Sequence, residues 1–340
     1  MSTKHARSAA AALLVASALV TAPAAHAMPP CDVEFFPGTT DTAAHPVAQG
    51  LIQRMPDGNM WFGEGASIAR VLARPPYTIT KFAIPTPAGV TNDITAGPDG
   101  HYWFTEIIGN KIGRISPRPP HAITEIPLPP GSTQPDSIVL GPDGNLWFTL
   151  WRGEIGRISP RAPYPIDVFP LPTQGGMAHK LVRARDGRLW FTEITGNRIG
   201  RITLTRGEAP LIEQFPVPTP NSAPTGLTVA RDGSLWFAEG RAGKVARVDP
   251  ATPERMVEYD LPSPWSMPTD LAIGPDGDLW IAEMGTNAIA RLRPGRRGEA
   301  PTVTECSVPE TPWFVAVAPD GAVWFTEFHN PGIRIGRIEP

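Results

Sequence analysis

The 340-residue sequence is poor in several features, and each shortage excludes a class of protein. Only two cysteines are present, too few for a disulfide scaffold or a thiolate metal site. The 30 Lys and Arg residues nearly balance 33 Asp and Glu residues, so the net charge of −3 gives no reason to expect binding to nucleic acid or to an anionic membrane. The sequence also lacks a Gly-rich phosphate loop, a Ser nucleophile elbow and a Cys/His zinc spacing.

Long apolar runs are also missing, and the one moderate run lies near the N-terminus. Lys4 and Arg7 precede AAAALLVASALV, and Ala25-His26-Ala27 follows it. This pattern is typical of a secretory signal peptide with a small-x-small cleavage site. The run is shorter than the ~20 apolar residues that a membrane span needs. We therefore expect a signal peptide at 1–27, cleavage near Ala27, and one secreted domain at 28–340, either extracellular or periplasmic.

A repeated phrase dominates the rest of the chain. An Asp-Gly pair followed within a few residues by Trp-Phe-Thr-Glu, or a close variant, recurs seven times, with successive glycine spacings of 42, 44, 43, 46, 44 and 44 residues by subtraction. A constant period in the forties indicates a repeat architecture. The marker glycines are Gly58, Gly100, Gly144, Gly187, Gly233, Gly277 and Gly321.

Each period contains four strand-length runs and no helical periodicity. In the third period the runs are 137–140, 146–149, 155–158 and 166–169, and the Asp-Gly pair between the first two is a hairpin signal. The 42 prolines argue further against helices. Four strands in each of seven repeats predict an all-β, seven-bladed β-propeller.

The two ends of the chain predict how the ring closes. The last repeat stops after its third run, at 334–338, whereas 33–37 resembles the fourth runs of other repeats. We therefore expect the N-terminal segment to form the outer strand of the last blade, and deletion of 28–40 to lower the melting temperature sharply. In this arrangement Cys31 and Cys306 belong to the outer edges of neighbouring blades, which fan apart. The geometry weighs against a disulfide and an oxidising compartment favours one, so the pairing stays open.

The mouth of the channel is the predicted site. The residue eight before each marker glycine opens an inner strand on the face away from the Asp-Gly hairpins, where loops and strand ends surround the channel. These residues differ from blade to blade, as a site for an asymmetric ligand requires. This entrance ring consists of Gly50, Asn92, Asp136, His179, Thr225, Thr269 and Trp313.

Two histidines are candidate catalytic residues. His179 in the entrance ring could act as a general base or a metal ligand, or could be a polar residue bonded to a neighbouring loop. His329 follows the phrase of the last blade, across the ring, so the two imidazoles are not expected to act on one atom.

The third copy of the phrase departs from the others. It ends in Leu150 where most copies end in Glu, and Trp151-Arg152 replaces a Gly-Asn loop. We expect Leu150, Trp151 and Arg152 to form an asymmetric wall of the ligand site. By contrast, the repeated Glu residues are expected to be structural, bonded to loop amides or to the arginines of the next strand, such as Arg114, Arg157 and Arg201. The oxygen-rich set Asn92, Asp93, Asp136 and Asp270 could hold Mg²⁺ or Ca²⁺.

The phrase with its following strand, as in Trp190-Phe191-Thr192-Glu193 and the segment GNRIGRI at 196–202, resembles the streptogramin B lyase (virginiamycin B lyase) family. The resemblance covers the whole of 28–340. It implies a seven-bladed propeller that opens a cyclic depsipeptide by elimination, with Mg²⁺ and a histidine base. Thr269 and Trp313 stand at the family's histidine positions, and Glu310 and Glu327 lie near those of its acidic metal ligands.

Three functional hypotheses stay open. The leading one is an exported monomer that binds a small or cyclic ligand at the channel face, such as a cyclic depsipeptide or lactone opened by metal-assisted elimination. The second is a non-catalytic propeller that recognises a small molecule, cyclic peptide or protein. The third is a metal-dependent lactonase.

Overall fold

The computed structural model describes residues 28–36, 50–87, 89–173, 175–295, 300–329 and 332–339, except for the side chains of His329 and Gly332. The segment 1–27 lies outside these ranges, so the signal peptide, its cleavage and secretion stay predictions. Within the described ranges no helix has the length and apolar character needed to cross a bilayer.

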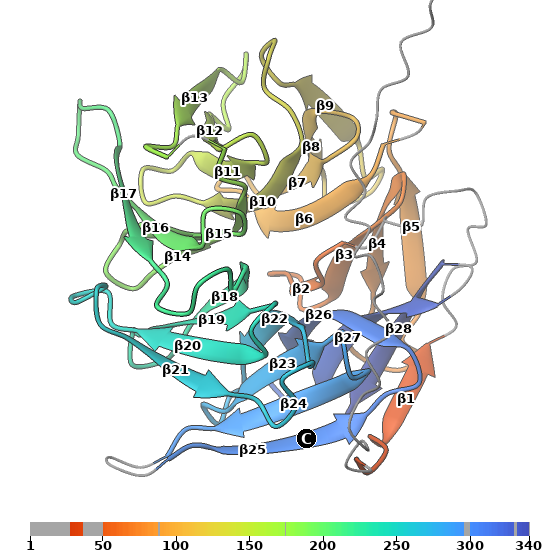
Figure 1. Ribbon diagram of the computed structural model, residues 1–340. Coiled ribbons are helices and arrows are strands. Elements are labelled where there is room, and N and C mark those ends of the chain that lie inside the picture. The colour runs from red at the N-terminus through yellow and green to blue at the C-terminus, as the bar shows by residue number, and fades with distance from the viewer. Residues whose placement is uncertain are drawn as a thin grey trace, which may run out of the picture.

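The strands form seven antiparallel four-stranded sheets arranged around a ring (Figure 1). In each of the first six blades the strands follow one another in sequence from the channel outward. These strands are, by blade, β2 (Gln53–Arg54), β3 (Met60–Glu64), β4 (Ser67–Val71), β5 (Ile79–Ala83); β6 (Thr91–Ala96), β7 (Tyr102–Glu106), β8 (Lys111–Ile115), β9 (Ile123–Pro127); β10 (Pro135–Leu140), β11 (Leu146–Leu150), β12 (Glu154–Ile158), β13 (Ile166–Pro170); β14 (Ala178–Arg183), β15 (Leu189–Glu193), β16 (Arg198–Thr203), β17 (Leu211–Pro216); β18 (Pro224–Val229), β19 (Leu235–Glu239), β20 (Lys244–Val248), β21 (Met256–Asp260); β22 (Pro268–Ile273), β23 (Leu279–Glu283), β24 (Ala288–Arg293), β25 (Thr302–Ser307).

The seventh blade closes the ring with strands from both ends of the chain. It contains β26 (Thr311–Val317), β27 (Val323–His329), β28 (Gly332–Ile338) and, outermost, β1 (Val33–Phe36). β1 pairs antiparallel with β28, with Val33 opposite Ile338 and Phe36 opposite Ile335. The predicted all-β propeller and its closure by the N-terminal strand are both confirmed.

The two cysteines form a disulfide, Cys31–Cys306, with Cα atoms 4.9 Å apart. The expectation that the outer edges of blades 6 and 7 fan apart was wrong for this segment. Before β1 begins, the chain runs beside the outer strand of blade 6, where the amide of Cys31 donates to the carbonyl of Ser307 and the amide of Ser307 donates to that of Pro29, both at 2.9 Å. The N-terminal segment therefore bonds to two blades and links them.

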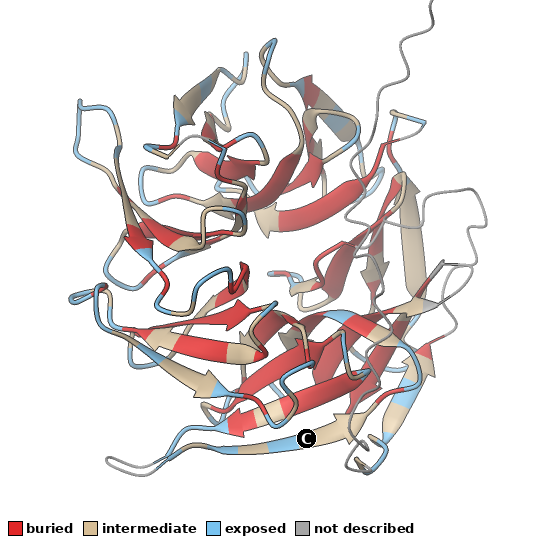
Figure 2. Ribbon diagram, viewed as in Figure 1, coloured by how far each residue is buried: buried red, intermediate tan, exposed pale blue. Residues whose placement is uncertain are grey.

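The apolar core lies between blades. The central strands are buried, whereas the outer strands are partly exposed (Figure 2). The repeated Trp packs at these interfaces, and in several blades an Arg of the third strand lies over its ring. Those arginines pair with acidic groups near the hairpins or on outer strands: Arg114 with Asp99, Arg157 with Asp167, and Arg201 with Glu213. Their predicted pairing with the repeated glutamates was therefore wrong.

Candidate functional site

A β-bulge opens the inner strand in six of the seven blades and places one or two residues in an irregular step at the channel. In blade 4, Ala178 pairs with Glu193 and Leu181 pairs with Phe191, so His179 and Lys180 together occupy the irregular step. The same two-residue step occurs in blades 2, 3 and 5, whereas in blades 6 and 7 the irregular step holds one residue, Thr269 or Trp313. Bulges redirect side chains in this way at many functional sites. In blades 2 to 5 the entrance ring predicted from sequence therefore has a second layer, formed by the residue after each ring residue.

The Thr of the repeated phrase holds this bulge and joins neighbouring blades. Thr149 Oγ1 accepts from the amide of Ser137 in its own blade at 3.0 Å and donates to the carbonyl of His179 in the next blade at 2.7 Å. Thr105 makes the same pair of bonds, to the amide of Asp93 and the carbonyl of Asp136. The phrase thus fixes the backbone that carries the variable ring.

Asp136 and His179 form the most closely joined ionisable pair at the channel mouth. Nδ1 of His179 lies 2.5 Å from Oδ2 of Asp136, whose side chain is 2% exposed. Nδ2 of Asn92 donates to the other carboxylate oxygen of Asp136, also at 2.5 Å. Three ring residues from three consecutive blades, all predicted as site residues, are therefore brought into one hydrogen-bonded chain.

The electrostatics of this pair favour the imidazolium. Burial alone disfavours a charged ring, but the charge of Asp136 and its hydrogen bond outweigh burial, so the pKa of His179 is raised. The side chain of His179 is 18% exposed, and among the described residues no hydrogen bond engages its Nε2. The geometry holds Nδ1 as a donor to Asp136 and leaves Nε2 for a ligand, the arrangement used by histidine bases.

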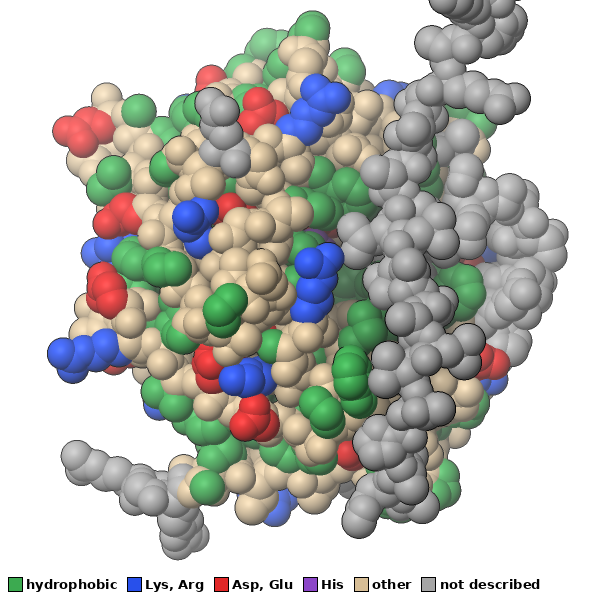
Figure 3. Space-filling model, in the orientation of Figure 1, with side chains coloured by type: hydrophobic (Ala, Val, Ile, Leu, Met, Phe, Trp, Pro, Cys, Tyr) green, Lys and Arg blue, Asp and Glu red, His purple; other side chains and the backbone are tan. Residues whose placement is uncertain are grey.

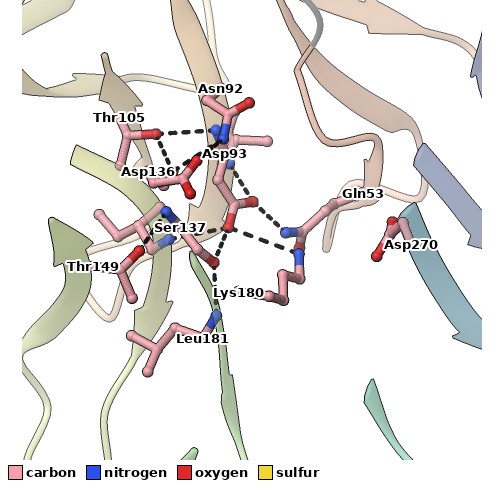
Figure 4. Close-up of polar contacts among 12 residues, drawn as sticks. Gln53, Asn92, Asp93, Thr105, Asp136, Ser137, Thr149, Lys180, Leu181 and Asp270 are labelled. Atoms are coloured by element: carbon pink, nitrogen blue, oxygen red, sulfur yellow. Dashed lines mark hydrogen bonds and ion pairs between the residues drawn. The ribbon is translucent and has the colours of Figure 1, made fainter. Parts of the chain in front are cut away.

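Second-layer residues and Gln53 of β2 form a network around Asp93 (Figure 4). Its Oδ1 accepts from Nε2 of Gln53 at 2.5 Å, and its Oδ2 accepts from Oγ of Ser137 at 2.6 Å. Nζ of Lys180 lies 3.9 Å from the same Oδ2. Sequence reasoning included Asp93 but missed Gln53, Ser137 and Lys180, because a repeat alignment assigns one residue per blade to the ring.

Asp270 contributes a further buried carboxyl across the channel from Lys180 (Figure 4). Burial raises the pKa of Asp270, and this outweighs the opposing effects of the Lys180 charge and of the backbone amides of Val315 and Leu271. In the described part of the channel mouth, the carboxyls of Asp93, Asp136 and Asp270 therefore surround the Lys180 ammonium and the His179 imidazole.

Thr269 and Trp313 lie on the far side of the ring from His179. The hydroxyl of Thr269 donates to the carbonyl of Trp313 at 2.6 Å, which joins blades 6 and 7. In blade 6 Ala282 occupies the position of the repeated Thr and has no hydroxyl to bond to the next blade. The hydroxyl of Thr269 makes the bond between blades 6 and 7 in its place. Trp313 is 36% exposed and is open to contact with a ligand.

The predicted wall formed by residues 150–152 is only partly in place. Leu150 is fully buried in the core between blades 2 and 3, so it offers no surface to a ligand and that prediction needs correction. Trp151 is half-buried, and Arg152 is exposed.

The replacement of the repeated Glu by Leu150 is accompanied by a second replacement on the outer strand of the same blade. Val168 packs against the cluster that contains Leu150, at the register position held by Gln214 in blade 4. There Gln214 bonds to Glu193, the residue equivalent to Leu150. Blade 3 thus replaces a buried polar pair with an apolar pair. Together with the burial of the other phrase glutamates, this supports the structural role expected for them.

The predicted metal ligands do not fit a divalent cation as arranged. Glu327 is fully buried and ion-paired with Arg334 at 2.8 Å, and it also accepts from the amide of Glu310. Among the described residues, no three His, Cys, Asp or Glu side chains are grouped to hold a metal ion. His329 ends β27, but its side chain lies outside the described part, so its predicted role is not addressed.

The fold and site define a class: a seven-bladed propeller with an irregular, ionisable channel mouth built on a uniform scaffold. The sequence model of the virginiamycin B lyase family matches residues 40–299 and 210–340, and the chain belongs to this family. No curated protein matches the chain by sequence.

Solved structures agree with this assignment. A streptogramin B lyase structure is 30% identical, with a TM-score of 0.78, covering 90% of this chain and 97% of the other. The selenomethionine-substituted virginiamycin B lyase from Staphylococcus aureus is 30% identical, with a TM-score of 0.76, covering 91% and 99%. A catalytically inactive His-to-Ala variant of that enzyme with quinupristin is 29% identical, with a TM-score of 0.77 and the same coverage. The streptogramin B lyase-like propeller fold is therefore established.

Proposed function

We propose that this protein binds a small cyclic ester, such as a cyclic depsipeptide or a lactone, at the channel mouth and opens it with His179 as the base. The observation that carries the proposal is the 2.5 Å contact between Nδ1 of His179 and Oδ2 of Asp136. Family membership supports the substrate class, since similar structures are described as streptogramin B lyases.

The chemistry follows from the orientation of the imidazole. In the neutral ring, Nδ1–H donates to Asp136, so Nε2 carries the lone pair and faces a ligand. Nε2 takes a proton from the carbon next to a carbonyl group. The electron pair of that C–H bond forms a C=C bond to the β-carbon, the bond from the β-carbon to the ester oxygen breaks, and a carboxylate is released within the same molecule.

Lys180 supplies a positive charge next to the base. Its ammonium comes from the same bulge as His179 and has a side chain only 12% exposed. A cation at this position stabilises negative charge that develops on the carbonyl or carboxylate oxygens. Mg²⁺ dependence stays a prediction for the assay, and no step of this mechanism depends on a metal.

A second function, non-catalytic recognition, is favoured by the residues at the family's histidine positions. Thr269 and Trp313 cannot transfer a proton as an imidazole does, and the hydroxyl of Thr269 is engaged with a backbone carbonyl. If this second function holds, the channel mouth binds the cyclic ligand and leaves its ring closed. A metal-dependent lactonase would instead require a ligand set that the described residues do not group.

Purified protein incubated with a streptogramin B or a simple lactone, with Mg²⁺ or with a chelator, distinguishes these functions by mass spectrometry. Elimination opens the ring without changing the mass, whereas hydrolysis adds one water. Calorimetric titration of the same ligands measures binding separately. Binding without ring opening would support recognition. If the wild-type protein neither binds nor opens any of these ligands, the proposed site is contradicted.

A further inference from the structure

A second candidate site lies on the opposite face of the propeller, at the hairpin turns of blades 4 and 5. An open pocket of about 380 Å³ is lined by the β14–β15 turn, the β18–β19 turn and the β20–β21 loop. Arg185, Arg188 and Arg247 line it, together with three aspartates. This pocket shares no residue with the channel mouth, and its role is independent of the function proposed above.

The turns that form the pocket differ in sequence from those of the other blades. Arg185 and Arg231 precede the Asp-Gly pair in blades 4 and 5, whereas the other five copies have proline there, namely Pro56, Pro98, Pro142, Pro275 and Pro319. Proline at this position pre-sets the backbone of a turn. Arg185 and Arg231 do not restrict the turn backbone in this way, and they add one cation to the surface of each of two adjacent blades.

The pocket is open because a covering ring is missing. In blades 1 to 3 an aromatic or imidazole ring from the loop after the third strand packs on the preceding blade: Tyr77 on Trp324 at 6.0 Å, His121 on Phe82 at 4.5 Å, and Tyr164 on Trp103 at 5.8 Å between ring centroids. In blade 5 the corresponding position is Glu254, which is exposed. The space beside the hairpin of blade 4 is therefore not filled in this way.

A buried donor beside the pocket lacks an acceptor. In blades 1 to 3, Nε1 of the repeated Trp donates to the Asp of the Asp-Gly turn, as Trp147 does to Asp143 at 3.0 Å. Trp190 is fully buried, yet among the described residues its Nε1 has no hydrogen-bond partner. The equivalent acceptor, Asp186, accepts from the amide of Arg188 at 2.9 Å and from Nη1 of Arg188 at 3.1 Å. A buried unsatisfied donor is costly, so an alternative arrangement in which Asp186 accepts from Trp190 is favoured if another anion holds Arg188.

The charges around the pocket suit an oxyanion. Among the described residues Arg185 has no ion pair, and the guanidinium of Arg188 reaches Asp186 through one contact only. Arg247, the third arginine of the lining, is already paired with Asp232 at 2.7 Å. The lining therefore holds three arginines and the three aspartates Asp186, Asp232 and Asp249, and it leaves Arg185 and Arg188 as the cations for a ligand. Guanidinium groups bind carboxylate and phosphate through paired hydrogen bonds.

We propose that this pocket binds a small oxyanion, a carboxylate or a phosphate, on Arg185 and Arg188. The bound anion replaces Asp186 as the partner of Arg188, and Asp186 then accepts from Nε1 of Trp190, as its counterparts do in blades 1 to 3. Anion binding on the surface is thereby coupled to a hydrogen bond in the core of blade 4.

Titration with inorganic phosphate and with acetate, followed by calorimetry and by the indole N–H resonance of Trp190, tests the proposal. The resonance is assigned with a Trp190→Phe variant. We expect saturable binding of one or both anions, accompanied by a downfield shift of the Trp190 indole proton as it gains an acceptor. Comparison of the affinities for acetate and for phosphate shows whether the site binds carboxylates or phosphates.

Arg185→Gln and Arg188→Gln should each weaken binding about tenfold or more, because each removes a charged hydrogen bond. Arg188→Gln should also shift the Trp190 resonance without anion, since it releases Asp186. The exposed Arg206, outside the pocket, gives the matched control Arg206→Gln, which should bind as wild type does. Absence of binding to both anions, or equal affinity in the Arg185→Gln and Arg206→Gln proteins, would overturn the proposal. Melting temperatures confirm that the variants are folded.

Discussion

Oδ2 of Asp136 lies 2.5 Å from Nδ1 of His179, and the two residues come from neighbouring blades. Neither residue is part of the repeated phrase, yet the phrase holds the backbone of both. Thr105 donates to the carbonyl of Asp136, and Thr149 donates to the carbonyl of His179. A uniform scaffold thus positions a unique pair.

Removing the charge of Asp136 should lower the pKa of His179. Asp136→Asn keeps an acceptor for Asn92 but removes the anion that favours the imidazolium, so the pKa of His179 should fall. A raised histidine pKa stabilises the fold below the unfolded-state pKa, and this contribution is lost as pH rises through the folded-state pKa. The wild-type protein should therefore lose more stability across that range than the variant. NMR titration of His179 measures the shift directly, and an unchanged pKa would contradict an ion pair.

A carboxylate at position 150 should destabilise blade 3. Leu150→Glu places a charge in a fully buried apolar cluster without the polar partner found in blade 4, at a cost of about 2–4 kcal/mol in the free energy of unfolding. Adding Val168→Gln recreates the Glu193–Gln214 pair and should recover about 1 kcal/mol or more. Chemical denaturation of the single and double variants tests this. If the double variant recovers no free energy of unfolding, the residue at position 168 does not explain why Leu150 replaces the repeated Glu.

The disulfide should contribute strongly to ring closure. Cys306→Ser removes a link that closes a loop spanning 275 residues and should lower the free energy of unfolding by about 2–4 kcal/mol. Cys31→Ser should have the same effect, and the double variant should lose no more than either single variant. Thermal unfolding with and without reductant provides the comparison, in which only the wild-type protein should respond to reductant.

The free energy of unfolding should fall as the pH rises from 4.5 to about 7, because the buried carboxyl of Glu106 keeps its proton in this range and the same carboxyl in the unfolded chain loses it. Burial raises the pKa of Glu106 from 4.5 to about 7; the nearby Glu125 adds to the rise and Lys111 opposes it. Between these pH values the folded state holds more protons than the unfolded state, so stability decreases as pH rises. Glu106→Gln should therefore gain about 1 kcal/mol over wild type at mildly alkaline pH and little at acid pH. Glu208→Gln, at an exposed position, should leave the pH profile of the melting temperature unchanged.

The scaffold was predictable because its signals are local. Asp-Gly hairpins, strand-length runs and a constant period fix each blade within about forty residues, and the missing fourth run of the last repeat predicted the role of 33–36. The ring position also identified Asn92, Asp136 and His179, because it varies while its surroundings do not.

The remaining features depend on contacts between distant segments. The bulge brings Lys180 toward Asp93 of another blade, and no count of residues from the marker glycine shows which second-layer residues meet. Leu150 resembled a wall of the site because its partner, Val168, lies two strands away. The disulfide depends on the path of the chain before β1, which pairs with blade 6 through backbone bonds that no side-chain pattern encodes.

The most direct test is the rate of ring opening of a streptogramin B by wild-type protein and by His179→Ala, followed by chromatography and mass spectrometry across pH ~5 to 9. The account predicts a product of unchanged mass, a rate that rises as His179 loses its proton, and a loss of about 10²-fold or more in the variant, with His101→Ala as an unaffected control. Ring opening at the wild-type rate by His179→Ala, or no ring opening by the wild-type protein at any pH, would contradict His179 as the base.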